Sequence, residues 1–283
     1  MKPLLAPLTS VEAYVAHFSH RPLPVLRKTA RELDQLRAQP EQATAKALSS
    51  IVLGDPLLTM RLLVHLQTHR SASRNADINT IERAVMMIGI NPFLRLFAEP
   101  DIVEDLLAEH PRALLGVLRV IGRARRAASL ARTFAILRHD LDVQEITVAA
   151  LLNEATEIVC WIYAPTLTGQ VYALQLADRG LRSAVAQRQV FGVTAAQLQL
   201  GLIEAWRLPD LLVQLLDHRL ENDPRVKTVS LAARIARHLA RGWDDAGLPD
   251  DIRELEALTR VPRSQLLKRL GAPAAAEARL MEV

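Results

Sequence analysis

Four arginines with helical spacing are the strongest candidates for binding chemistry in this chain. Seven arginines and no acidic residue lie between Arg112 and Arg138. On an ideal helix, which turns by about 100° per residue, four of them fall within about 60° of one another. These four are Arg112, Arg119, Arg123 and Arg126. Guanidinium groups in such a stripe could bind a phosphate or an acidic partner through paired hydrogen bonds. We expect the four to form one exposed patch; a solvated arginine face without a ligand is the favoured interpretation, and binding is the alternative.

Two histidines and the single cysteine offer weaker chemistry. His65 and His69 are four residues apart on a predicted helix, so they share a face and could hold a metal ion. No third ligand is indicated, and a solvated face is favoured. Cys160 lies in an apolar segment with no neighbouring base to activate it, which indicates a core residue and predicts a reducing compartment.

Three further residues are better explained by packing than by function. Trp206 and Pro209 follow a predicted helix, where packing of the helix end is favoured over a contact surface. Asp55 precedes Pro56, and a helix N-cap accounts for it.

The elements that position these residues are predicted to be helices. The chain has 283 residues, of which 50% are hydrophobic, 4% are aromatic and only 11 are glycine. This balance disfavours sandwiches and barrels, which need frequent turns and β-branched or aromatic strands. The net charge is +4, and Arg supplies 30 of the 35 basic residues. No apolar run is long enough for a membrane helix and the amino-terminal segment is no signal peptide, so we expect a cytoplasmic protein.

Helix boundary signals are frequent along the chain. Spacings typical of a capping box occur at Thr9 with Glu12 and at Asp142 with Glu145. The second precedes a very apolar segment, 146–163, which we expect to form one helix. A long helix is expected over 111–137.

Several motifs, in the right order, resemble those of HDOD domains, which are bacterial output domains related to HD and HD-GYP metal-dependent phosphohydrolases. The similar segments lie at 22–26, 51–58, 61–63, 78–85, 88–89, 149–152, 191–193 and 206–209. The resemblance covers roughly residues 20–240. It implies a multi-helical, all-α fold: an N-terminal extension (1–20), a lobe of about five helices (21–110) packed on a larger HD-like helical bundle (111–270), and a flexible tail (271–283).

The same resemblance implies a degenerate metal site. In HD enzymes a His-Asp doublet follows two leucines, and here that position holds Asn153 and Glu154. The upstream histidine would fall near Ala124, where there is none, and only His218 matches a family histidine. An amide is a poor ligand for a transition metal compared with imidazole. We therefore expect no metal, no cofactor and no catalytic residue.

The hypothesis that follows is a non-catalytic bacterial regulatory module. It would bind signalling proteins in trans, or a phosphate-bearing ligand, and would not bind membranes. One alternative is a divergent nucleotide or cyclic-dinucleotide phosphohydrolase that uses Glu154 and His218. Another is nucleic-acid binding through the arginine stripe, which the lack of a helix-turn-helix and of interleaved aromatic residues disfavours. The identity of the partner and the oligomeric state stay open.

Overall fold

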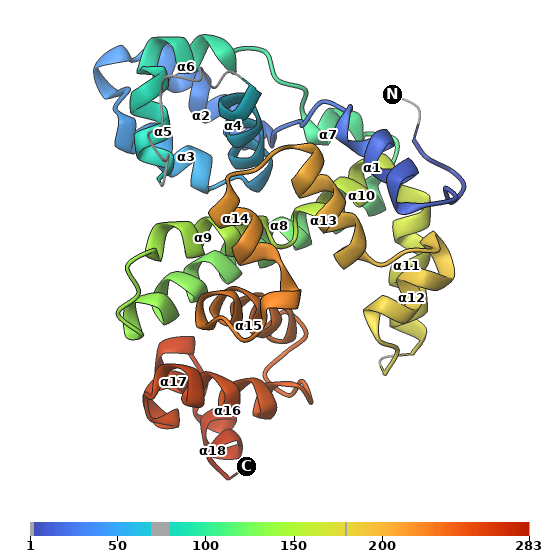
Figure 1. Ribbon diagram of the computed structural model, residues 1–283, viewed down its shortest axis with the longest axis vertical. Coiled ribbons are helices and arrows are strands. Elements are labelled where there is room, and N and C mark those ends of the chain that lie inside the picture. The colour runs from blue at the N-terminus through green and yellow to red at the C-terminus, as the bar shows by residue number, and fades with distance from the viewer. Residues whose placement is uncertain (1–2, 69–79, 179, 283) are drawn as a thin grey trace. The chain divides into compact units, whose positions relative to one another are not determined.

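The computed structural model describes residues 3–68, 80–178 and 180–282. Within these ranges the chain forms α-helices and short 3-10 helices, and no β-strand (Figure 1). The all-α prediction is confirmed. A single isolated parallel bridge joins Val25 to Ile102.

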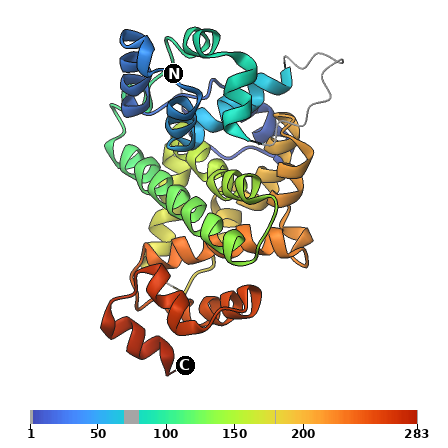
Figure 2. The ribbon, with the colours of Figure 1, turned by 90° about the vertical axis from the view of Figure 1, so that its left-hand side faces the viewer.

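The chain divides into two compact units, each built from segments that are distant in the sequence. The first unit combines Met1–Ile121 with Ala155–Val213, and the second combines Gly122–Glu154 with Gln214–Val283. This division differs from the single boundary near residue 110 expected from the sequence. The reason is local: one helix, α8 (Pro111–Leu137), runs without interruption through residues of both units (Figure 2).

The first unit contains most of the helices. They are α1 (Val11–Ser19), α2 (Arg27–Ala38), η1 (Pro40–Gln42), α3 (Ala45–Leu53), α4 (Pro56–Thr68), α5 (Ile81–Ile88), α6 (Ile90–Leu96), α7 (Val103–Leu106), α10 (Ala155–Tyr163), α11 (Pro165–Ala177), α12 (Ser183–Phe191) and α13 (Ala195–Ala205). The first part of α8 and most of α14 (Asp210–Leu216) also belong to it.

Helix α1 is part of the core of this unit. Ser10, rather than Thr9, caps it by accepting a hydrogen bond from the Ala13 N–H. Tyr14 and Phe18 are fully buried, and the Tyr14 hydroxyl donates to the Phe191 carbonyl at 3.0 Å. The segment expected to be an extension is therefore anchored by two aromatic side chains, whose burial is a large source of stability.

Asp55 joins two helices of the first unit. Its carboxylate caps α4 by accepting from the N–H groups of Leu57 and Leu58, as predicted. It also accepts from the Leu26 N–H and the Thr29 hydroxyl at the start of α2, at 3.0 and 2.7 Å. Burial raises the pKa of Asp55, and these four hydrogen bonds act in the opposite direction.

The second unit contains the remaining helices. They are the second part of α8, α9 (Val143–Leu152), η2 (His218–Leu220), α15 (Pro224–Leu239), α16 (Leu248–Thr259), α17 (Arg263–Leu270) and α18 (Ala274–Met281). Helix α15 packs against both α9 and α16.

The apolar segment 146–163 forms two helices, not the single helix expected. Helix α9 ends at Leu152 and α10 begins at Ala155, with Asn153 and Glu154 between them. Burial is nearly continuous on both sides, so the hydrophobic pattern gave no signal for the break. Residues Val143–Tyr163 are long and apolar enough to cross a membrane, but 83% of their most apolar 18-residue window is buried inside the protein.

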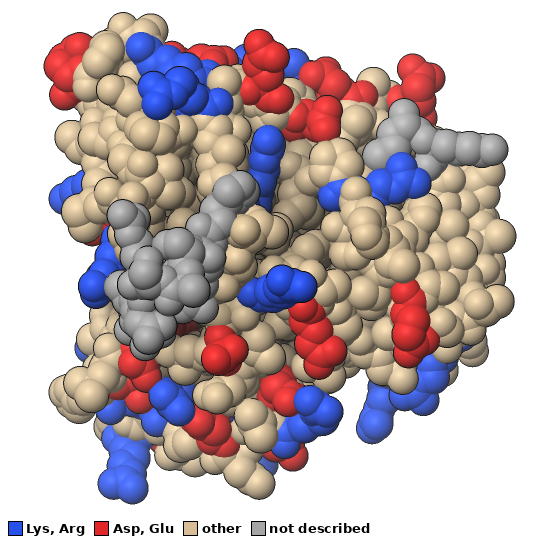
Figure 3. All heavy atoms as spheres, turned by 45° about the horizontal axis from the view of Figure 1, so that its top comes forward, with Lys and Arg blue, Asp and Glu red and all other residues tan. Residues whose placement is uncertain are grey.

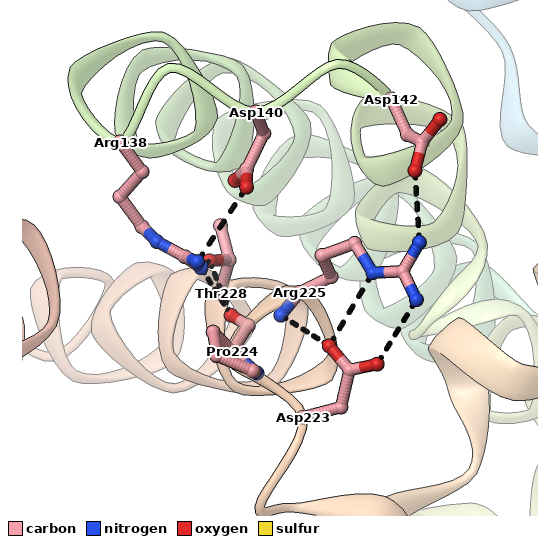
Figure 4. Close-up of polar contacts among 7 residues, drawn as sticks. All are labelled: Arg138, Asp140, Asp142, Asp223, Pro224, Arg225 and Thr228. Atoms are coloured by element: carbon pink, nitrogen blue, oxygen red, sulfur yellow. Dashed lines mark hydrogen bonds and ion pairs between the residues drawn. The ribbon is translucent and has the colours of Figure 1, made fainter.

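Asp142 makes no side-chain cap at the start of α9. Its carboxylate instead pairs with Arg225 of α15 at 2.8 Å, and Arg225 also pairs with Asp223 at 3.1 Å (Figure 4). Beside this pair, Arg138 donates to the Thr228 hydroxyl at 2.8 Å. The loop between α8 and α9 is thus attached to the first turn of α15 by charged hydrogen bonds.

The tail predicted to be flexible is helical as far as the structure describes it. Pro273 precedes α18, and three consecutive alanines open it, which favours a helix. Ala276 and Leu280 are buried, and the Arg263 side chain donates to the Leu280 carbonyl at 3.2 Å. The expectation of a frayed end was wrong because short-range composition gave no indication that α17 would bury these side chains.

Candidate functional site

Glu154 lies at the centre of a charged cluster in the second unit. It occupies the break after α9, and only 2% of its side chain is exposed. Arg123 of α8 donates to one carboxylate oxygen at 2.6 Å, and Arg237 of α15 donates to the other at 2.7 Å. Burial alone would raise the pKa of Glu154, but the two guanidiniums outweigh it and hold the pKa at about 2.

His218 lies in the electrostatic field of the same cluster. It is the first residue of η2, and Asp217 caps this short helix by accepting from the Arg219 N–H. The protein atoms packed around His218 lower its pKa, as does the positive charge of Arg237, while Asp217 and Glu154 oppose the shift. His218 is exposed, and no hydrogen bond or ion pair among the described residues joins it to Glu154, so the two interact only through this field.

The other two residues of the expected site supply no charged ligand. Ala124 is fully buried and packs in an apolar cluster with Ala128 and Leu151. Asn153 is the C-cap of α9, and its side-chain oxygen is buried without a hydrogen-bond partner in the described structure. At the two positions where the family resemblance implies histidines, this chain thus has a methyl group and an amide.

These residues do not fit a catalytic metal centre. No group of three or more His, Cys, Asp or Glu side chains within the described ranges could hold a metal ion. Each oxygen of Glu154 already accepts from a guanidinium, and a divalent cation there would be repelled by both of them.

Arg237 is the residue of this cluster that sequence reasoning missed. It lies on α15, more than a hundred residues from Arg123, and no local motif marks it. The one available signal was Glu154 itself, because a carboxylate in an apolar segment needs a cation to remain buried.

The arginine stripe of α8 has two different environments. Arg112, Arg119 and Arg126 are exposed, as expected. Arg123 is not: 16% of its side chain is exposed, because it serves as counter-ion to Glu154. The prediction of one exposed patch of four was therefore wrong for Arg123.

The exposed arginines make weaker contacts. Arg119 donates to the Tyr172 hydroxyl at 3.2 Å, and Arg126 to the Leu270 carbonyl at the carboxyl end of α17 at 3.4 Å. A cation at the end of a helix is favourable, but the effect at an exposed site is small.

The remaining candidates are structural. Trp206 is buried, which contradicts a contact surface at that position, and Pro209 beside it is half-buried. Cys160 is buried, and burial raises the pKa of its thiol to about 12, so it is not a reactive thiolate. His65 is half-buried on α4, whereas His69 lies outside the described residues.

The distribution of charge does not favour a nucleic-acid interface on the face drawn in Figure 3. Blue and red side chains alternate across it, and no broad basic field is visible. Proteins that bind nucleic acid need such a field to neutralise phosphates.

The fold defines the class: this is an HD-like, all-helical protein. A family comparison then identifies it further. Residues 23–221 match the HDOD domain, so the chain belongs to the HDOD family and contains a signalling-related domain.

Two solved structures have a similar fold. The MmoQ response regulator of Methylococcus capsulatus str. Bath is 20% identical, with a TM-score of 0.57, and the alignment covers 92% of this chain and 97% of that one. A virulence factor from Campylobacter jejuni subsp. jejuni is 18% identical, with a TM-score of 0.61, covering 94% and 93%. At these identities the similarity concerns the fold alone. No curated protein matches the chain at a significant level.

Proposed function

We propose that this protein is a non-catalytic regulatory module of the bacterial cytoplasm, which acts by binding a signalling partner on a degenerate HD scaffold. The observation that carries the proposal is the ion cluster of Glu154 with Arg123 and Arg237. It replaces the doublet that holds a metal in HD enzymes.

The chemistry of the cluster opposes hydrolysis. Metal-assisted hydrolysis needs a metal-bound water, and the metal needs its full set of ligands. Glu154 has both oxygens occupied by guanidiniums, and Ala124 has no ligand atom. The positive charges act inside the protein, where they hold α8, the end of α9 and α15 together. In this proposal the cluster stabilises the domain, and the surface of the domain carries the function.

The test compares hydrolysis by the wild-type protein and two variants. Purified protein is supplied with Mn²⁺, Fe²⁺ or Zn²⁺ and assayed on bis(p-nitrophenyl) phosphate and cyclic dinucleotides, with an active HD phosphohydrolase as control. We expect wild type to be no more active than Glu154→Gln or His218→Ala, and elemental analysis to find no stoichiometric metal. Metal-dependent turnover that is lost in folded His218→Ala would establish the phosphohydrolase alternative instead.

A further inference from the structure

A surface formed by α8 and α11 of the first unit combines exposed apolar side chains with unpaired positive charge. We define this α8–α11 surface by six residues: Arg112, Leu115, Leu118 and Arg119 of α8, and Tyr172 and Leu176 of α11. The exposed fractions of the four apolar or aromatic members are 48% for Leu115, 42% for Leu118, 47% for Tyr172 and 64% for Leu176. Single exposed apolar residues are common, whereas several on adjacent helices indicate an interaction site.

Trp161 of α10 lies beneath the surface and contacts both helices. Gly116 of α8 lies against the indole of Trp161 in α10, so close that a Cβ at this position would be 2.6 Å from the ring. The Tyr172 ring packs at 61° to the same indole, with ring centroids 6.3 Å apart. Arg119 then donates to the Tyr172 hydroxyl across the surface. These contacts hold the exposed side chains on a rigid base, which lowers the entropic cost of binding.

The α8 residues share one sector of their helix. At about 100° per residue, Arg112, Leu115 and Arg119 fall within about 60°, and Leu118 is about 60° beyond Leu115. On α11, Tyr172 and Leu176 are four residues apart and therefore adjacent on one face. Because Gly116 faces Trp161 and Arg119 reaches Tyr172, the two arginines lie on the side of this sector nearest α11. Leu115 and then Leu118 lie beyond them.

The positive charge of this surface is not balanced by acidic side chains on its own two helix segments. Helix α11 carries no charged side chain, and the α8 segment 111–121 carries no acidic one. No ion pair among the described residues involves Arg112 or Arg119, and the partner of Arg119 is a neutral phenol. Tyrosine and arginine on a rigid apolar base are the residue types that dominate binding energy in protein interfaces.

We propose that the α8–α11 surface docks an amphipathic helix of a partner protein, with the apolar face of that helix on Leu115, Tyr172 and Leu176 and acidic side chains against Arg112 and Arg119. The charge argues for this occupant over a second copy of the chain, because two such surfaces face to face would bring arginines together. The docking would supply the partner binding on which the proposed function rests.

The test uses two synthetic peptides and the full chain. The first is a fluorescein-labelled amphipathic helix of about 18 residues, or about five turns, with leucines on one face and glutamates on its flanks. The second peptide has lysine in place of each glutamate. Binding is measured by fluorescence anisotropy, and folding of each variant by circular dichroism and thermal unfolding.

We expect the glutamate peptide to bind wild type and the lysine peptide to bind at least about tenfold more weakly. Leu176→Asp weakens binding of the glutamate peptide by about tenfold or more. Arg119→Glu reverses the preference between the two peptides. The matched control is Leu141→Asp in the second unit, where the leucine is 98% exposed; it leaves binding unchanged.

Three results would overturn the proposal: no binding of the glutamate peptide, equal binding of both peptides by wild type, or binding that survives Leu176→Asp and Arg119→Glu. Sedimentation velocity adds a fourth, a dimer that these two variants dissociate, since the occupant would then be a second copy. None of these measurements involves Glu154. Failure here is therefore distinguishable from the hydrolysis result that would defeat the proposed function.

Discussion

Arg119 and Arg123 are one helical turn apart on α8, yet they belong to two regions with opposite character. Arg123 is nearly buried, and its charge is balanced by Glu154, which also binds Arg237. Arg119 is exposed, and its hydrogen bond to Tyr172 is not an ion pair. In the first region the charges form ion pairs within the protein, whereas the second presents charge and apolar area to solvent. The comparison teaches that arginines one turn apart on one helix can differ in role, because one faces a buried carboxylate and the other faces solvent.

The largest expected effect tests the structural role of the ion cluster formed by Glu154, Arg123 and Arg237. Glu154→Gln leaves two guanidiniums around an uncharged amide, and breaking a buried ion pair in this way costs about 3–5 kcal/mol. We expect a loss of this order in the free energy of unfolding, measured in urea by circular dichroism. The matched control is Glu221→Gln, an exposed glutamate of the same unit, which changes the free energy by about 0.5 kcal/mol or less. Equal effects of the two substitutions would show that Glu154 stabilises nothing.

Lowering the pH is a second way to disrupt the ion cluster of Glu154. The pKa of Glu154 is held at about 2, below its ordinary value of 4.5. A carboxyl with a depressed pKa in the folded state contributes stability in full above its unfolded pKa. That contribution is lost as the pH falls from about 4.5 towards 2, and a depression of this size is worth about 3 kcal/mol.

The pH measurement compares wild type with Glu154→Gln. The free energy of unfolding of each protein is measured in urea from about pH 6 downwards. The difference between the two values narrows between about pH 4.5 and 2, because only wild type has a carboxyl group at position 154 to be protonated. A difference that is constant down to the acid unfolding of wild type would contradict the assignment of the low pKa to Glu154.

Local signals in the sequence predicted much of the fold and only part of the site. The long helix α8 was predictable, because helix periodicity acts over a few residues. Cys160 and Asp55 were also interpreted correctly from their neighbours.

What could not be predicted depends on partners distant in the sequence. The burial of Arg123 follows from Glu154, thirty-one residues away, and the second cation comes from Arg237. The helix break at Asn153 lies inside an apolar stretch, where the hydrophobic pattern does not distinguish one helix from two. The burial of Trp206 likewise needed the packing of its unit. The sequence identified the family positions, but not which side chains would neutralise them.

The smallest expected effect concerns the contacts beneath the α8–α11 surface. Two glycines of α8 provide a matched pair of variants. A Cβ on Gly116 would lie 2.6 Å from the buried indole of Trp161, whereas a Cβ on Gly122 would meet nothing within 4 Å. Replacing a helical glycine by alanine gains about 1 kcal/mol of helix propensity where space allows. Overpacking a buried contact costs about 1–3 kcal/mol. We therefore expect Gly122→Ala to stabilise the protein by about 0.5–1 kcal/mol and Gly116→Ala to destabilise it by about 1 kcal/mol, measured by urea unfolding. Because the rigid indole also supports Tyr172, Gly116→Ala should weaken binding of the glutamate peptide, and Gly122→Ala should not. Stabilisation by both substitutions would mean that Trp161 moves freely, and the α8–α11 surface would then lack the rigid base that docking requires.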